Sequence, residues 1–433
     1  MKGTFAKDKI YIFFLCLVAF AIPFPFIYSS ISIILLLIVW IITTDFKKTL
    51  YLFLKNKYLW FWCLLFLLTA ISYIYSFDKT LSINDLQRKL SFIILPIIIG
   101  TQLKIDKNVL KKIFTCFVSG LLIVIMFCIV NAIIRWQHTK DLDVFFYHNL
   151  VAGLNANAVY YALYIYFALV LILLYNWEGT FFQIKWVYSV ALSLLLIFFI
   201  LLSSKSLLLL FIILVFPVFL IRTLKKHKLI SLIIIIVGFS TIGGIFFTQN
   251  PIHKRYQEIL ENNDKESWLP EYANGQKQHF NNLTLRRFLW STAIENIKEN
   301  NLWLYGCGNG GVLELQKQKI KKKIIEYGAD NQLINTNPPL WDYNLHNMYL
   351  QTLMMLGIPG LFTFLVILIA PLIFIKFKEE KRIYYLFFIS IIIFMFQESA
   401  LQTQAGIVYS TYFYMVIYSY VQSTYRKENI TII

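Results

Sequence analysis

Long apolar runs separated by short basic segments fill most of this sequence, and they leave few folds open to it. A helix needs roughly 20 apolar residues to cross a bilayer. Only 15% of the 433 residues are charged and 58% are hydrophobic, whereas about a quarter of the residues in a soluble domain are charged. The sequence therefore predicts an all-α polytopic membrane protein. We predict about twelve spans, at residues 10–28, 29–43, 58–76, 90–103, 112–135, 157–175, 184–202, 204–221, 229–248, 346–375, 383–397 and 404–422.

The net charge of +17 comes largely from lysines and arginines in the short segments between these runs. With the N-terminus inside the cell, basic clusters at 47–57, 104–112, 222–228 and 376–382 all fall on the inner side, and the outer loops carry fewer basic residues. This asymmetry follows the positive-inside rule and predicts the orientation. The distribution is not typical of a nucleic-acid site, so we expect no nucleic-acid partner.

One long polar segment interrupts the pattern, at residues 249–345, and the predicted orientation places it outside. It divides the chain into residues 1–248 with nine spans, the external loop 249–345, and residues 346–433 with three spans. Thr284 is a plausible N-cap for an amphipathic helix with Leu285, Phe288, Leu289, Ala293 and Ile297 on one face. The stretch ELQKQKIKKKIIEYG predicts a second helix, whose lysines either form a solvated face or rest on an anionic membrane surface.

His346 lies where this polar segment meets the tenth apolar run, in the sequence DYNLHNMYLQTLMMLGIPG. At a helix N-terminus, free N–H groups and the helix dipole favour anions and disfavour a charged imidazole. A neutral His346 there is a candidate general base. The alternative is that His346 and Asn347 only cap the helix at the membrane interface.

Several other charged residues are candidates for binding an anion near the outer face. Arg286 and Arg287 lie on the predicted loop helix, where guanidinium groups either bind phosphate or are simply solvated. Lys205, in LLSSKSLLLLF, is a charge at membrane depth and is therefore a functional candidate, or else its ammonium extends to the outer headgroups. Glu398 ends the eleventh run, where it either orients another side chain or merely terminates the helix.

Two further patterns resemble ligand sites, although both have simpler interpretations. GCGNGG at 306–311 lacks the strand–helix–strand context of a nucleotide-binding loop, and we interpret it as a flexible turn. Asp141 and Asp143 form a D-x-D pair of the kind that binds a metal in some glycosyltransferases, but such pairs arise often by chance. We therefore expect no metal and no cofactor.

The tenth predicted span contains its own irregularity. Gly357 and Gly360 have a small-x-x-small spacing that permits close helix contact. Pro359 lacks an N–H, and we expect it to kink the helix.

Three stretches resemble the O-antigen ligase/polymerase superfamily of bacterial envelope enzymes. They are SSKSLLLLF, RRFLWSTAIENIKENNLWLYGCGNGG and HNMYLQTLMMLGIPG, in the same order as in the family. The number of predicted spans and the loop after the ninth also fit the family. The resemblance covers about residues 200–400 well and the first half of the chain only by topology. Lys205 is a departure, because the family more often has arginine at that position.

The resemblance implies a GT-C type membrane glycosyltransferase of the bacterial inner membrane, with its active site facing the periplasm. The donor is expected to be a glycan on a polyprenyl pyrophosphate, and the acceptor a hydroxyl of lipid A–core in the ligase branch. The alternatives are an O-antigen polymerase or a protein O-oligosaccharyltransferase of the same superfamily. Carried over to this chain, the catalytic roles fall on His346, Arg286 and Lys205, with Arg287 and Asn347 as substrate-binding residues.

A different class of function, a flippase for lipid-linked sugars, also fits a polytopic chain. A flippase needs a polar path through the bilayer, which intramembrane charges usually mark. Such charges are few within the predicted spans, and the polar groups gather at the outer ends of the spans. The sequence therefore favours the enzyme.

Overall fold

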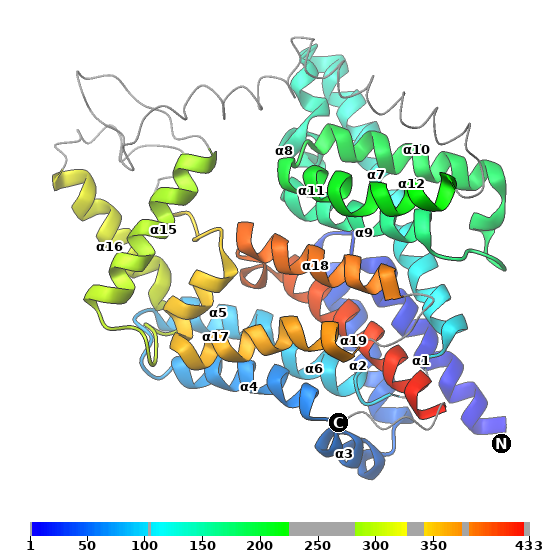
Figure 1. Ribbon diagram of the computed structural model, residues 1–433, viewed down its shortest axis with the longest axis horizontal. Coiled ribbons are helices and arrows are strands. Elements are labelled where there is room, and N and C mark those ends of the chain that lie inside the picture. Colours follow the sequence, from blue (N-terminus) through cyan, green and yellow to red (C-terminus); the bar gives the residue numbers. More distant parts are fainter. Residues whose placement is uncertain (1, 103–104, 225–281, 327–341, 375–380, 428–433) are drawn as a thin grey trace.

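The computed structural model describes residues 2–102, 105–224, 282–326, 342–374 and 381–427 (Figure 1). Across these residues the regular structure is helical, and they contain no strand. The α-helices are α1 (Lys2–Ala21), α2 (Phe26–Thr43), α3 (Phe46–Lys55), α4 (Lys57–Ser72), α5 (Lys79–Lys89), α6 (Ser91–Ile98), α7 (Lys107–Thr139), α8 (Tyr147–Leu150), α9 (Ala158–Leu174), α10 (Lys185–Leu202), α11 (Lys205–Leu210), α12 (Phe216–Leu224), α15 (Asn282–Glu299), α16 (Gly311–Glu326), α17 (Met348–Phe374), α18 (Lys381–Gln397) and α19 (Gln404–Lys427). Short 3₁₀ turns are η1 (Leu142–Phe145), η2 (Ala152–Leu154), η3 (Phe181–Gln183) and η8 (Ala400–Gln402), and a π-helical turn, η4 (Phe211–Val215), joins α11 to α12.

The predicted apolar runs coincide with described helices except for the ninth, 229–248, which lies outside the described residues. Five described helices are long and apolar enough to cross a membrane, or six if the pair α3–α4, bent by 91°, counts as one span. The all-helical membrane-type fold is therefore confirmed. The number of twelve spans, the position of the external loop and the three-part division of the chain remain predictions.

The centre of the described bundle is built around α9, which is buried on almost every face. Phe167 on α9 stacks against Phe117 of α7, Phe387 of α18 and Phe413 of α19 at ring-centroid distances of 4.7–5.9 Å. Lipid chains are as apolar as these rings, so van der Waals packing and hydrogen bonds must hold the helices together.

Tyrosine hydroxyls supply several of the hydrogen bonds between helices. Tyr11 of α1 donates to the carbonyl of Ile98 at 2.8 Å, and Tyr412 of α19 donates to the carbonyl of Leu15 at 2.6 Å. Each bond reaches a backbone oxygen on a helix distant in sequence, which fixes the depth of one helix against another.

The described part of α15 starts at Asn282, so Thr284 lies inside the helix and the predicted N-cap is wrong. The predicted inward face is confirmed for Phe288, Leu289, Ala293 and Ile297, which are all at most 1% exposed, and Leu285 is half-buried.

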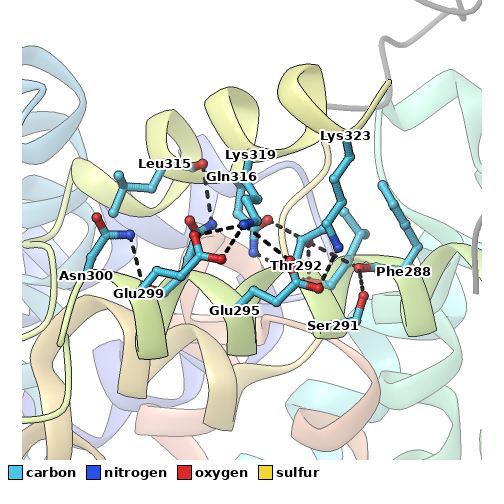
Figure 2. A network of polar contacts seen from close by, with 12 residues as sticks. Phe288, Ser291, Thr292, Glu295, Glu299, Asn300, Leu315, Gln316, Lys319 and Lys323 are labelled. Atoms are coloured by element: carbon cyan, nitrogen blue, oxygen red, sulfur yellow. Dashed lines mark hydrogen bonds and ion pairs between the residues drawn. The ribbon is translucent and has the colours of Figure 1, made fainter. Parts of the chain in front are cut away.

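The next helix, α16, packs along α15 through a polar network (Figure 2). Lys319 Nζ lies 2.6 Å from Glu299 Oε1, Lys323 Nζ lies 2.5 Å from Glu295 Oε1, and the Thr292 hydroxyl donates to Gln316 Oε1 at 2.8 Å. The hydrogen bond and charge of Lys319 lower the pKa of the Glu299 carboxyl. The basic run is therefore not a uniformly solvated face, because two of its lysines bind α15.

Helix α17 is broken at Gly357, whose φ of 68° and ψ of −164° are not helical. The predicted kink is present, but it lies two residues before Pro359. The break frees the N–H of Ile358, which donates to the carbonyl of Trp303 at 2.7 Å. The connection between α15 and α16 thus supplies the hydrogen bond that the break removes from α17.

The connection between α15 and α16 also bonds the residues of α17 that precede the break. The N–H groups of Cys307 and Gly308 donate to the carbonyls of Met354 and Met355 at 2.9 and 3.1 Å. A Cβ on Gly357 would lie 2.4 Å from the carbonyl oxygen of Leu304. Gly357 therefore does permit a close contact, but with the backbone of this connection rather than with another membrane helix.

Candidate active site

His346 lies two residues before the start of α17, in the left-handed backbone region with φ of 45°. Its N–H donates to Asn344 Oδ1 at 2.9 Å, a local turn that holds this conformation. Asn347 then caps the helix, because its Oδ1 accepts from the N–H of Leu350 at 3.0 Å. Asn347 is 2% exposed, and its role as a substrate ligand stays a prediction.

The imidazole of His346 contacts the carboxylate that follows α18. Its Nδ1 lies 3.1 Å from Glu398 Oε2, and the two side chains are 20% and 5% exposed. A second bond ties the same segments together, because the N–H of Asn347 donates to the Ser399 hydroxyl at 3.1 Å. No local pattern links His346 to a residue 52 positions away, so Glu398 was not among the predicted site residues.

This contact defines what the histidine can do. A carboxylate only accepts hydrogen bonds. Nδ1 therefore carries the ring proton and donates a hydrogen bond to Glu398. The lone pair then lies on Nε2, the other ring nitrogen, and the ring is held in one orientation. An imidazole arranged in this way can take a proton from a hydroxyl presented to Nε2.

Helix α15 brings the predicted arginines toward this pair. The indole of Trp290 donates to the carbonyl of Leu345 at 2.8 Å, and its ring stacks edge-on against Phe396 with centroids 5.3 Å apart. Thirteen residues further along both segments, Ile358 bonds Trp303. The two segments therefore run side by side in the same direction, and Figure 1 shows α15 next to α17.

Arg286 lies one helical turn before Trp290, on the same face of α15. Its Cα therefore lies about 6 Å along the helix axis from Trp290, toward the N-terminus of α15. Arg286 is half-buried, whereas Arg287 is exposed. Of the two, Arg286 shares the face of α15 whose Trp290 contacts Leu345, the residue before His346.

Lys205 is the first residue of α11, immediately after a break in the chain direction. Helix α10 ends at Leu202, and Ser203 adopts a left-handed conformation with φ of 42°. Helix α11 packs against α9 and α18, and α18 is the helix that ends at Glu398. Because α11 has only six residues, Lys205 lies within about 8 Å along the helix of these packing contacts. The structure thus brings His346 and Glu398 into direct contact, whereas Lys205 lies on α11, a helix that packs against α18.

The two patterns considered as ligand sites have structural roles. Asp141 Oδ1 accepts from the N–H of Asp143 at 2.9 Å and caps η1. The described residues hold no group of three or more histidine, cysteine or acidic side chains that would bind a metal. The turn at 306–311 is packed rather than flexible, because the N–H groups of Asn309 and Gly310 donate to the hydroxyls of Ser72 and Ser76 at 3.1 and 2.7 Å.

Cys307, in the same turn, is 4% exposed. Burial raises the pKa of its thiol to about 12. A thiol with this pKa stays protonated at neutral pH and is a poor nucleophile, so Cys307 belongs to the packing of the turn.

Comparison with known proteins finds a similarity over part of the chain. Residues 190–365 fit the family model described as O-antigen ligase, and none of the curated proteins matches the chain. The matched region contains Lys205, Arg286 and His346, whereas Glu398 lies beyond its end. This part of the chain is therefore similar to the O-antigen ligase family of membrane enzymes.

Proposed function

We propose that this protein transfers a glycan from a polyprenyl-pyrophosphate donor to an acceptor hydroxyl at the outer, periplasmic face of the bacterial inner membrane. The family match supports the class of enzyme. The contact between His346 Nδ1 and Glu398 Oε2, 3.1 Å long, carries the proposal, because it leaves a fixed basic nitrogen at the start of α17. Within this class we assign the protein first as an O-antigen ligase acting on lipid A–core.

The acceptor hydroxyl is activated at His346. Its proton passes to Nε2 as its oxygen forms a bond to the anomeric carbon of the donor. Glu398 stabilises the imidazolium that results, since its carboxylate already accepts the hydrogen bond from Nδ1. The burial of Glu398 strengthens this interaction relative to one in water.

The bond between the anomeric carbon and the diphosphate oxygen breaks in the same step, and the polyprenyl diphosphate leaves with the electron pair. Arg286 and Lys205 supply positive charge where this negative charge develops. Arginine binds two phosphate oxygens through its planar fork, and lysine contributes a point charge. The hydrophobic polyprenyl chain remains in the outer leaflet, next to the spans.

The identity of the acceptor is tested with one defined donor and three acceptors. Purified full-length protein in lipid is given a polyprenyl-pyrophosphate glycan with lipid A–core, with a second lipid-linked repeat, or with an acceptor protein. Product on lipid A–core alone is expected. Product only on the lipid-linked repeat or only on protein would assign the polymerase or the protein glycosylation branch. Movement of the donor across the bilayer without any transfer would identify a flippase and end the proposal.

The two adjacent arginines offer a matched pair of variants. Arg286→Ala is expected to lower kcat by about 100- to 1,000-fold, the usual cost of one electrostatic contact in the transition state. Arg287→Ala is expected to cause a smaller loss, and mainly in KM, because this side chain is exposed and Arg286 is half-buried. Single-turnover transfer rates measure both effects. Equal losses in the two variants would remove the special role of Arg286.

Transfer is also expected to continue at an unchanged rate in EDTA. Fixed cations at Arg286 and Lys205 provide the charge that a divalent metal would otherwise supply. The measurement is the initial rate with and without chelator. Loss of turnover that manganese or magnesium restores would bring back Asp141 and Asp143 as metal ligands.

A further inference from the structure

Helix α5 carries a buried ion pair that the proposed reaction does not use. Lys89 is 1% exposed and Asp85 is 6% exposed, and Lys89 Nζ lies 2.5 Å from Asp85 Oδ2. Charged side chains are almost never buried this deeply unless they are paired. Sequence patterning assigned Lys89 only to a short outer loop, so this pair was not expected.

The ammonium of Lys89 reaches beyond its own helix to the connection between α15 and α16. It donates to Asn309 Oδ1 at 3.3 Å and lies 3.6 Å from Met355 Sδ. Asn309 in turn donates through Nδ2 to the carbonyl of Ser82 at 3.0 Å. Lys89 therefore joins α5, the 306–311 turn and the first half of α17 at one point.

Stability alone is a weak reason for such a cluster. Removing two charges from water is costly, and well-packed apolar residues in the same space are often as stabilising as a buried ion pair or more so. A buried charge does impose one arrangement on its neighbours, because any other arrangement leaves it unpaired. The unpartnered Asp85 Oδ1 among the described residues shows that the cluster is not optimised for stability.

The contacts of Lys89 connect, through the 306–311 turn and α17, to the segment that carries His346. Asn309 belongs to the turn whose Cys307 and Gly308 bond the carbonyls of Met354 and Met355. Those methionines precede the break at Gly357 and lie in the short helical segment that begins just after His346. The neighbouring residue on α5, Arg88, donates through Nη1 to the carbonyl of Gln402, in the loop that starts at Glu398. Helix α5 thus contacts the segments of both members of the His346–Glu398 pair.

We propose that Lys89 is a positioning residue for glycan transfer, which holds the 306–311 turn and the first half of α17 so that His346 stays aligned with Glu398. The inference rests on the proposed function for its effect on rate. Its structural part, the fixing of residues 306–311 and 348–358, is independent of which glycan is transferred.

The test uses a double variant that removes the charges without leaving one unpaired. Lys89→Met alone strands the buried Asp85 carboxylate and is expected to reduce the yield of folded protein. Lys89→Met with Asp85→Leu avoids this cost and is expected to unfold near the wild-type temperature. Gln87→Met, an exposed position on the same helix, is the matched control and should behave as wild type in every measurement.

Two readouts are measured on the full-length protein in lipid. In the double variant, hydrogen exchange of residues 306–311 and 348–358 is expected to rise, with other regions unchanged. The kcat for transfer is expected to fall about 100-fold, the scale of a displacement of about 1 Å at a catalytic group, with KM for the donor little changed. Lys89→Arg keeps the charge and is expected to recover part of kcat.

The outcomes separate the two proposals. Wild-type exchange in the double variant overturns the role of Lys89, whatever happens to the rate. Raised exchange with a wild-type kcat overturns it as well, because the held segment would then not position the catalytic pair. A wild-type protein that transfers to no acceptor defeats the proposed function, and the exchange measurement still decides whether Lys89 fixes the turn.

Discussion

Replacing His346 by alanine is expected to leave the protein folded and inserted in the membrane but to reduce glycan transfer by about 100-fold or more. Loss of a general base typically costs a factor of about 10² to 10⁴ in rate. The His346 side chain is partly exposed, and the residue lies before the start of α17 rather than within a helix. Its side chain therefore contributes little to packing. The measurement is the single-turnover rate with a defined polyprenyl-pyrophosphate donor, normalised to the amount of folded protein.

His148 provides a matched control within the same chain. It is followed by Asn149 as His346 is followed by Asn347, and its Nδ1 accepts a long bond of 3.4 Å from the N–H of Ala158 rather than contacting a carboxylate through that bond. His148→Ala is expected to retain transfer, and Glu398→Gln to lose part of it, because an amide cannot stabilise an imidazolium as a carboxylate does. Near-normal transfer by the His346→Ala variant would exclude His346 from the reaction.

The second large effect is expected on stability. Gly357→Ala should lower the free energy of unfolding by about 3 kcal/mol or more, since a backbone conformation open almost only to glycine costs about 1–3 kcal/mol for other residues and overpacking adds a similar amount. The new Cβ would lie 2.4 Å from the Leu304 carbonyl oxygen, and backbone at that position cannot move aside as a side chain can. The thermal unfolding midpoint in detergent with added lipid reports the change.

A Gly179→Ala variant distinguishes the cost of the backbone conformation from the cost of steric overlap. It also has a positive φ, of 76°, but a Cβ there meets no atom within 4 Å. Gly179→Ala is expected to cause only the smaller, conformational part of the loss. A Gly357→Ala variant as stable as Gly179→Ala would show that the connection between α15 and α16 does not press against the break in α17.

Much of the bundle was predictable because the bilayer imposes long apolar helices. The runs at 112–135, 157–175 and 184–202 lie within or match α7, α9 and α10 closely. Helices α3 and α5 were missed because they are short and mixed in polarity, and such segments carry no signal of spanning length. Thr284 was predicted as the N-cap of α15 but lies inside the helix, since the apolar periodicity begins only at Leu285.

The candidate site was predictable in part, and the missing part depends on tertiary structure. His346 and Arg286 were found because each residue type has a local reason to be at its position. Glu398 was set aside, because nothing near it in sequence shows that its partner is an imidazole 52 residues away. The 306–311 turn was misinterpreted because glycines suggest mobility, whereas here they allow close backbone contact, as at Gly310, where a Cβ would lie 2.1 Å from the Asp78 carbonyl oxygen.

The backbone hydrogen bonds between residues 303–308 and α17 limit the length that the connection between α15 and α16 can have. The N–H of Ile358 donates to the carbonyl of Trp303, and the N–H groups of Cys307 and Gly308 donate to the carbonyls of Met354 and Met355, so residues 303–308 are attached on both sides of the break at Gly357. One residue added or deleted between Trp303 and Cys307 would displace one of these two attachments. The connection between α15 and α16 is therefore expected to keep a constant length.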